Sequence, residues 1–228
     1  MLSIVVPVLD EAAIIQGTLR SLQDLRRRGC EVIVVDGASS DATRSLAAPL
    51  ADRVIDAPRG RAAQMNAGAR AARGDILLFL HADTFLPAGA LDEIESGLAR
   101  TGRAWGRFDV TISGSRALTL VAAMMNLRSR LSGIATGDQA MFARRAAFEA
   151  AGAFPEIPLM EDVALSKALK RLSPPLCLRA RAATSGRRWQ RHGTVRTILL
   201  MWRLRLAYAL GADPRRLARR YDVERTSS

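Results

Sequence analysis

The chain has 228 residues, 49% of them hydrophobic and 5% aromatic, which suits one α/β domain with a full core and excludes a disordered or low-complexity chain. Its formal net charge is +12, and such a field attracts phosphates, acidic lipid surfaces or nucleic acid without choosing among them. Two cysteines and two histidines are too few for a zinc site built from several such ligands. Any metal would be held mostly by carboxylates, phosphates and water, as Mg²⁺ or Mn²⁺ is.

The first residues lack the basic segment and small-residue cleavage site of a signal peptide. The longest uncharged apolar run, 117–127, is too short to span a membrane. Cys30 and Cys177 follow no metal-ligand spacing, and we expect two reduced, buried thiols. These features predict a cytoplasmic protein.

In the first half, apolar segments alternate with helical ones. Runs rich in Val, Ile and Leu predict buried strands at 2–7, 31–36, 53–56 and 75–80. Helices are expected at 11–28, after the capping residues Ser40 and Asp41, at 61–73, and after Pro87. Continuous apolar strands that alternate with helices are typical of a mostly parallel sheet covered on both faces.

The second half is less regular. We expect strands at 105–112, 139–143 and 176–184, and helices at 116–131, 162–172 and 195–210. No linker forces a domain split, so we predict one domain over 1–186 with a basic, amphipathic helical extension over 187–228. That extension could lie on an anionic membrane surface, at the inner face of the cell membrane, or pack against the domain or a second subunit.

Polar side chains follow the ends of three predicted strands. Asp10 and Glu11 follow the first, Asp36 ends the second, and His81 and Asp83 follow the fourth. In parallel α/β sheets, ligands bind at the carboxyl ends of the strands. We therefore expect these side chains to share one crevice.

Three motifs occur in a characteristic order: residues 5–11 (VVPVLDE), 34–41 (VVDGASSD) and 79–84 (FLHADT). Together they resemble family 2 glycosyltransferases of the GT-A fold, a Rossmann-like α/β fold. Later, 137–139 (GDQ) and 161–162 (ED) look like that family's acceptor-side and catalytic-base motifs. The resemblance covers about residues 2–172. The segments GRAAQMNAGA and ATGDQA are similar to a small bacterial subgroup, the transferase 2 proteins associated with radical SAM and selenium genes.

The resemblance implies a nucleotide site. Its residues would be Pro7, Leu9, Glu11, Asp36, Arg61, Gln64, His81 and Ala82. Arg61 and Gln64 are three apart on a predicted helix and share a face, and a basic residue at a helix start can bind diphosphate. Several of these residues also have a structural alternative. Asp36 precedes Gly37 in a common turn pair, and Glu11 suits the first turn of a helix. Arg61 and Gln64 could form the polar edge of an ordinary Ala-rich helix.

The resemblance also implies a divalent metal, Mn²⁺ or Mg²⁺. Asp83 matches the metal-binding position of the family's Asp-x-Asp motif, in which His81 here replaces the first carboxylate. His192 would complete the metal site, as a histidine does in some relatives. The structural alternatives are a helix-capping role for Asp83, a strand-end role for His81 and a surface position for His192.

Catalysis would fall to the ED pair. Neighbours on a helix point about 100° apart, so only one of Glu161 and Asp162 can face the reacting atoms. By the family match Asp162 is the general base, while Gly137, Asp138 and Glu161 shape the acceptor pocket. The alternative is a pair of acidic residues that only stabilise a helix start.

The predicted activity is inverting transfer of a sugar from a UDP- or GDP-linked donor to the hydroxyl of an unidentified acceptor. A nucleotidyltransferase is the first alternative, although no Gly-rich, Lys-containing loop follows the first strand. A basic nucleic-acid-binding protein is the second, but helix-turn-helix, zinc-finger and RNA-binding motifs are missing, so we expect no nucleic acid. Peripheral membrane contact and a homodimer are further expectations.

Overall fold

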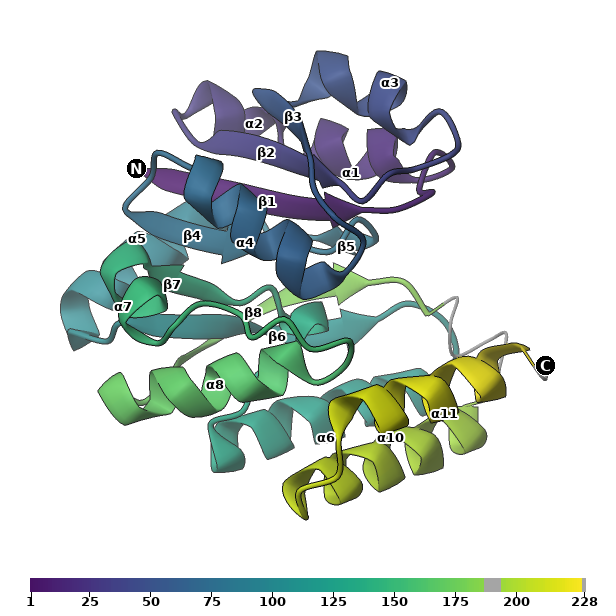
Figure 1. Ribbon diagram of the computed structural model, residues 1–228. Helices are drawn as coiled ribbons and strands as arrows, with labels where there is room; N and C mark the ends of the chain where they lie inside the picture. The colour runs from purple at the N-terminus through teal and green to yellow at the C-terminus, as the bar shows by residue number, and fades with distance from the viewer. Residues whose placement is uncertain (187–193, 227–228) are drawn as a thin grey trace.

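The computed structural model describes residues 1–186 and 194–226 (Figure 1). Within that part of the chain, eight strands form one sheet in the order β3-β2-β1-β4-β7-β6-β8-β5. Their bounds are β1 Leu2–Val8, β2 Glu31–Asp36, β3 Arg53–Asp56, β4 Ile76–Phe79, β5 Thr84–Phe85, β6 Trp105–Ile112, β7 Phe142–Arg144 and β8 Leu176–Thr184. The first four strands run parallel, β7 is antiparallel to both β4 and β6, and β8 runs parallel to β6.

Helices cover both faces of the sheet. Their bounds are α1 Ile15–Ser21, α2 Gln23–Arg27, α3 Thr43–Ala47, α4 Arg61–Ala71, α5 Ala90–Thr101, α6 Arg116–Ser132, α7 Arg145–Ala150, α8 Glu161–Leu172, α10 Thr194–Ala209 and α11 Pro214–Thr226. One buried cluster joins one face of β1, β2 and β4 to α1 and α5. A second joins the opposite face to α4, α7 and α8. The apolar strands are thus buried on both sides, as their composition predicts.

The helix α4 lies unusually close to the sheet because its small residues allow it. A Cβ added at Gly68 would come within 2.3 Å of Cγ1 of Val5 and 2.9 Å of Cγ2 of Val35. The buried Asn66 in the same helix donates to the carbonyl of Phe154 at 2.8 Å and accepts from its N–H at 3.0 Å. These contacts fix the helix start, with Arg61, beside the carboxyl ends of β1 and β2.

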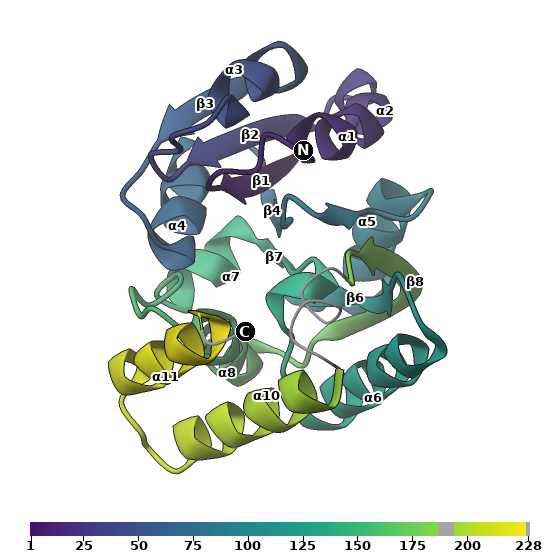
Figure 2. The same cartoon turned by 90° about the vertical axis from the view of Figure 1, so that its right-hand side faces the viewer.

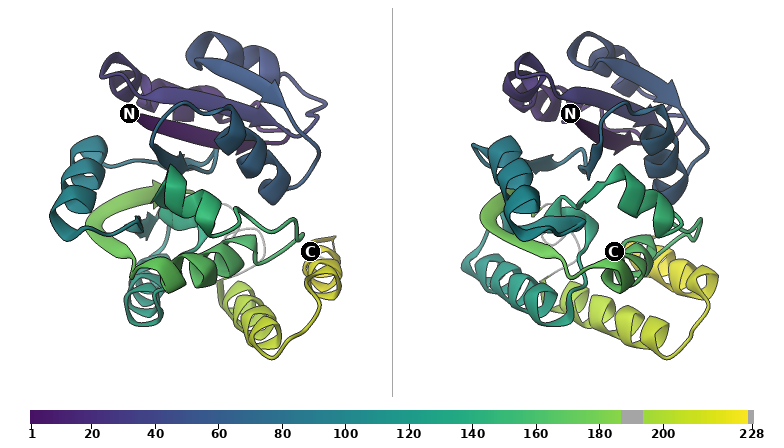
Figure 3. Two further views of the ribbon diagram at one scale, coloured as in Figure 1. Left: turned by 60° about the vertical axis from the view of Figure 1, so that its left-hand side comes forward. Right: turned by 90° about the vertical axis from the view of Figure 1, so that its left-hand side faces the viewer.

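The C-terminal helices pack against the rest of the domain. Leu204 of α10 and Leu217 and Tyr221 of α11 form a buried cluster with Met160 and Val163 at the start of α8. Figure 2 shows α10 between α6 and α11, and both views of Figure 3 agree. None of the helices in the described ranges is long and apolar enough to cross a membrane.

Most predicted elements are confirmed, and the strands 31–36, 53–56, 105–112 and 176–184 have the expected bounds. The helix expected at 11–28 is instead two short ones, α1 and α2, after an Asp10 with a left-handed φ of 53°. The strand expected at 139–143 begins only at Phe142, because Gly137–Gln139 forms a 3₁₀ turn closed by a capping box between Thr136 and Gln139. Cys30 is buried as expected, whereas Cys177 is only half-buried.

Candidate functional site

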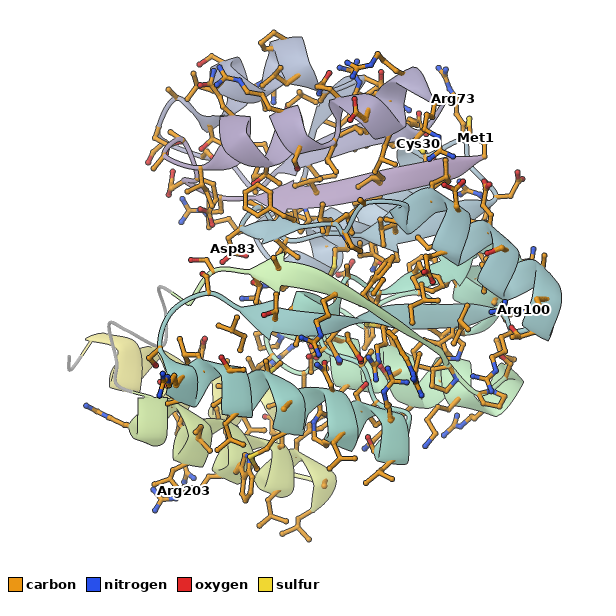
Figure 4. The ribbon with its side chains drawn as sticks, turned by 180° about the vertical axis from the view of Figure 1, so that it is seen from behind. Met1, Cys30, Arg73, Asp83, Arg100 and Arg203 are labelled. Atoms are coloured by element: carbon orange, nitrogen blue, oxygen red, sulfur yellow. The ribbon has the colours of Figure 1, made fainter. Side chains whose placement is uncertain are left out.

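The expected polar residues do lie at the carboxyl ends of the parallel strands. Figure 4 shows Asp83 at the edge of the molecule opposite Met1 and Arg73, which lie where β1 and β4 begin. Pro7 is buried within β1 beside Val35 of β2, and Leu9, just past the strand, is 38% exposed. The part of the candidate site expected to bind the nucleotide is therefore built from the chain segments that leave β1 and β2.

Two loops are tied together where β1 and β2 end. Asp36 is buried. Its carboxylate accepts two hydrogen bonds from Ser39, one from the N–H at 3.0 Å and one from the hydroxyl. Asp10 accepts from the N–H of Ser40 at 2.7 Å, and its own N–H donates to the Ser39 hydroxyl at 3.0 Å. Asp36 thus closes a side-chain turn, the structural alternative that its Asp-Gly sequence allowed.

Glu11 is fixed by its backbone. Its N–H donates to Oγ1 of Thr43 at 2.7 Å, and Asp41 in turn accepts from the N–H groups of Thr43 at 2.9 Å and Ala12 at 3.1 Å. The hydrogen bonds from Thr43 lower the pKa of the exposed Asp41 carboxyl. The first loop is therefore held in one conformation, with Glu11 half-buried.

Gln64 acts as a clamp on the strand ends. Its side-chain Nε2 donates to the carbonyl of Val8 at 2.7 Å and to that of Val35 at 2.9 Å, and the residue is 4% exposed. Both amide hydrogens are committed, so a nucleotide could meet only its carbonyl oxygen. Gly37 packs directly on this amide, because a Cβ there would lie 3.0 Å from Nε2.

Arg61 connects the two halves of the site. Its Nη1 lies 3.8 Å from Oε1 of Glu161, and its side chain is 44% exposed while that of Glu161 is 6% exposed. Burial, followed by the negative charge of Asp162, raises the pKa of Glu161, and the charge of Arg61 only partly opposes this. A half-exposed guanidinium beside a buried carboxyl can still offer N–H groups to an anion.

The end of β4 meets the acceptor-side motif. His81 Nδ1 lies 3.3 Å from Oδ1 of Asp138, and the imidazole also rests on Gly137. A Cβ on Gly137 would lie 2.3 Å from Nε2 of His81 and 2.4 Å from its Cε1. The buried Ala82 accepts a hydrogen bond through its carbonyl from the hydroxyl of Thr18. A glycine is therefore required at position 137 if His81 is to keep its place.

Asp83 is half-buried beside a cavity of about 480 Å³. Among residues 1–186 and 194–226, no group of three or more His, Cys, Asp or Glu side chains could hold a metal by itself. A single hard carboxylate nevertheless fits a Mg²⁺- or Mn²⁺-type ion whose other ligands are water and substrate phosphates. His192, expected as the second ligand, lies outside the described residues.

Asp162 stands at the centre of the site. Its Oδ2 accepts from the N–H of Gly137 at 3.0 Å and its Oδ1 from the N–H of Val163 at 2.7 Å, in the first turn of α8. The positive end of the helix dipole and these donors stabilise a carboxylate here. Glu161, its neighbour, turns toward Arg61 and is buried. Only Asp162 is partly accessible, as the angle between helix neighbours requires.

The structure adds two residues that the sequence did not indicate. Burial lowers the pKa of Arg128 in α6 to about 10, with a further lowering by Arg205 and an opposing effect of Asp162. Burial and the charge of Asp162 also raise the pKa of Tyr208 in α10. Both side chains therefore interact electrostatically with the Asp162 carboxylate. They come from helices whose relation to the site depends on tertiary packing, so no local sequence signal could have found them.

The structure is similar to solved glycosyltransferases. It resembles the mannosyltransferase from Pyrobaculum calidifontis in complex with GDP-Man and Mn²⁺, with a TM-score of 0.67, 22% identity, and coverage of 90% of this chain and 60% of that one. For S. aureus TarS 1-349 in complex with UDP-GlcNAc, the TM-score is 0.65 at 17% identity, with 81% of this chain and 58% of that one covered. At these identities the likeness shows the fold, which is GT-A as expected.

Sequence comparison points the same way. The chain is 39% identical over 93 residues to the PGL/p-HBAD biosynthesis glycosyltransferase of Mycobacterium bovis (strain BCG / Pasteur 1173P2), an overlap of 38% of this chain and 36% of that protein. The chain thus matches only about a third of the length of that curated relative. A sequence model described as glycosyl transferase family 2 matches residues 3–150, which include the ends of β1, β2 and β4 and the His81–Asp138 pair. With its GT-A fold and this match over well over half its length, the chain belongs to glycosyl transferase family 2 and is an enzyme of the transferase class.

Proposed function

We propose that the protein transfers a sugar from a UDP- or GDP-sugar to an acceptor hydroxyl with inversion at the anomeric carbon. One observation carries the proposal: the partly accessible carboxylate of Asp162 is held by the Gly137 N–H at 3.0 Å, beside the His81–Asp138 pair at the carboxyl edge of the sheet. A positioned, ionised carboxylate next to a nucleotide-type strand edge is what base-assisted sugar transfer needs.

In the proposed step, the acceptor oxygen attacks the anomeric carbon from the face opposite the nucleotide. The new bond joins that carbon to the acceptor oxygen, and the bond from the carbon to the diphosphate oxygen breaks. Asp162 takes the proton of the acceptor hydroxyl. The products are the glycosylated acceptor and a nucleoside diphosphate. Because Asp162 already accepts two backbone N–H groups, it can remain fixed while the proton arrives.

The donor would occupy the segments that leave β1, β2 and β4. We assign Glu11 and Asp36 to the nucleoside, with backbone contacts from Pro7, Leu9 and Ala82, and we assign the diphosphate to Arg61. Gln64 would act by holding the ends of β1 and β2 in register, since its amide bonds both carbonyls. His81 would contact the donor while Asp138 fixes its ring, and Gly137 and Glu161 would complete the acceptor side.

A divalent ion, Mn²⁺ or Mg²⁺, would be held by Asp83 together with the donor diphosphate, and we propose His192 as a second ligand. When bound, such an ion neutralises the charge that grows on the leaving diphosphate. Support comes from the similar structures, which were solved with UDP-GlcNAc or with GDP-Man and Mn²⁺. Whether the ion is Mg²⁺ or Mn²⁺ is decided by which of the two restores activity after chelation.

The proposal is tested with two variants and one control. Release of nucleoside diphosphate is measured with water as a surrogate acceptor, and donor binding is measured by thermal shift with and without Mn²⁺. Asp162→Asn should bind donor normally and release product about 10²- to 10⁴-fold more slowly. Asp83→Ala should lose the metal-dependent part of the shift. Asp92→Asn is the control: Asp92 is an exposed residue of α5 that pairs with Arg28, and this variant should resemble the wild type in both assays. Undiminished turnover in Asp162→Asn would refute its role.

We further propose that residues 187–228 form an extension that brings the site to a membrane surface. Exposed apolar side chains continue across the outer faces of two neighbouring helices. They are Leu120, Met124, Leu127 and Leu131 of α6, Leu199, Trp202 and Leu206 of α10, and Leu210 directly after α10. The net charge of +12 favours an anionic surface. Flotation with vesicles containing anionic lipid, but not with neutral vesicles, is expected. Concentration-dependent dimerisation without flotation would show that a second copy covers this face instead.

A further inference from the structure

The guanidinium of Arg128 is buried without adequate partners. Its Nη1 makes one long hydrogen bond, 3.5 Å, to the carbonyl of Ile134. Among the residues that the structure describes, its Nε and Nη2 are buried and donate to no acceptor. Nε and Nη2 form one edge of the guanidinium, the edge that pairs side-on with both oxygens of a carboxylate or phosphate. An unsatisfied edge of this kind is costly, and it indicates a ligand.

Arg128 lines an apolar cavity of about 180 Å³ between α6 and α10. The other lining residues are Val121, Met124, Met125, Asp138, Ile198, Met201, Trp202 and Arg205. Asp138 belongs to both sites, since its carboxylate also meets His81. Met124 and Trp202 are 45% and 58% exposed and connect the cavity with the apolar outer faces of α6 and α10. The cavity therefore runs from the acceptor side of the catalytic centre toward the surface.

The electrostatic balance at Arg128 favours an added anion. Burial and the charges of Arg205 and Arg107 lower its pKa to about 10, whereas the charge of Asp162 acts in the opposite sense. Two guanidinium groups are thus held near each other against apolar walls. An anion placed between them would relieve both the repulsion and the missing hydrogen bonds.

We propose that this cavity binds an anionic group, a phosphate or a carboxylate, on the acceptor molecule, which Arg128 and Arg205 hold while the acceptor hydroxyl reaches Asp162. The proposal rests on the proposed function, and it names the class of acceptor: an anion with an apolar portion. The buried Nε and Nη2 atoms become accessible only if a lining side chain moves. Met124, Met125 and Met201 are suited to this because methionine side chains adapt readily.

The position of the cavity separates it from the donor side. Glu11, Asp36 and Arg61 lie where β1 and β2 end and where α4 begins, whereas the cavity is formed by α6 and α10. Asp138 and Asp162 stand where the two regions meet, because Asp138 lines the cavity and the charge of Asp162 acts on Arg128. An acceptor in the cavity would therefore approach the base from the side away from the nucleotide.

The test uses two probes, inorganic phosphate and n-octyl phosphate, with octyl glucoside as the uncharged analogue. Their binding to the full chain is measured by calorimetry and thermal shift, for wild type, Arg128→Met and Arg130→Met. Arg130 lies in the same helix but pairs with Asp109 at 2.7 Å and does not line the cavity. Loss of the Arg128 hydrogen bonds should weaken phosphate binding roughly 10- to 100-fold. Arg130→Met should bind like the wild type.

A second readout does not depend on any ligand. Removing a buried, poorly partnered cation should leave the unfolding temperature of Arg128→Met at or above that of the wild type. Slow hydrolysis of the nucleotide sugar should be retained in Arg130→Met, whose changed residue lies outside the cavity, whereas the absence of hydrolysis in the wild type would count against the proposed function itself. Tighter binding of octyl phosphate than of inorganic phosphate indicates an anionic lipid acceptor, and equal binding indicates a soluble one. The inference is overturned if neither phosphate binds, if Arg128→Met binds them equally, or if a nucleoside diphosphate displaces them.

Discussion

The glycine at position 137 gives the sharpest test of the site geometry. Gly137→Ala places a Cβ 2.3 Å from Nε2 and 2.4 Å from Cε1 of His81, where an ordinary contact needs at least 3.4 Å. The imidazole must therefore retreat by about 1 Å, which breaks its 3.3 Å contact with Asp138. The same residue donates its N–H to Asp162, so any backbone shift also moves this proposed base. A displacement of this size can cost about 10²-fold in rate.

The assay is release of nucleoside diphosphate from the nucleotide sugar, together with the urea midpoint of unfolding. We expect about a 10²-fold lower rate and a loss of stability of about 1–3 kcal/mol, typical of overpacking. Gly97→Ala is the matched control. Gly97 lies in α5, away from the site, and a Cβ there would similarly crowd a side chain, 2.6 Å from Cδ2 of Leu176. That variant should keep the wild-type rate. If Gly137→Ala turned over normally, or if both variants lost rate in proportion to their stability, the reasoning about His81 would be wrong.

Three further predictions concern stability. Burial and Asp162 raise the pKa of Glu161, so the folded chain keeps this proton to a higher pH than the unfolded chain, and stability falls as pH rises through that interval. The melting temperature of Glu161→Gln should therefore equal that of the wild type at acid pH and exceed it at neutral pH. The same difference in melting temperature at both pH values would contradict this. Asn66→Ala removes both hydrogen bonds to the Phe154 backbone and should cost about 2–4 kcal/mol in urea unfolding, whereas a cost below 1 kcal/mol would show that these hydrogen bonds do not hold α4 in place. Asp109→Ala leaves the fully buried Arg107 without its carboxylate and should cost about 3–5 kcal/mol by the same measurement; a neutral variant would show that Arg107 finds other acceptors.

The strands and the polar residues at their carboxyl ends were predictable because their cause is local. Continuous apolar segments bounded by polar residues specify buried parallel strands, and the carboxyl ends of such strands meet at one edge. Asp36 and Gln64 show the limit of this reasoning. The sequence predicts a nucleotide contact for both, but the hydrogen bonds of Asp36 with Ser39 and of Gln64 with the carbonyls of Val8 and Val35 appear only in the fold.

The acceptor side could be predicted only in part. The motif at 137–139 and the pair at 161–162 are visible in the sequence, but nothing in either shows that they meet across 25 residues through the Gly137 N–H. Arg128 lies near the C-terminal end of the amphipathic helix α6, where an arginine is ordinarily a solvated surface residue. Its proposed role depends on the packing of α10 beside α6, two helices that are far apart in the chain. The short β5, the helix α7 and the last helix α11 likewise depend on tertiary contacts rather than on periodicity.

We propose that this site transfers a sugar and releases a nucleoside diphosphate, with Asp162 as the base. The most direct measurement is ³¹P NMR of the purified protein incubated with UDP- and GDP-sugars and Mn²⁺, compared with Asp162→Asn. We expect one nucleotide sugar to yield its nucleoside diphosphate without pyrophosphate, and the variant to form this product at least about 10²-fold more slowly. Pyrophosphate as product, or a variant as fast as the wild type, would contradict it.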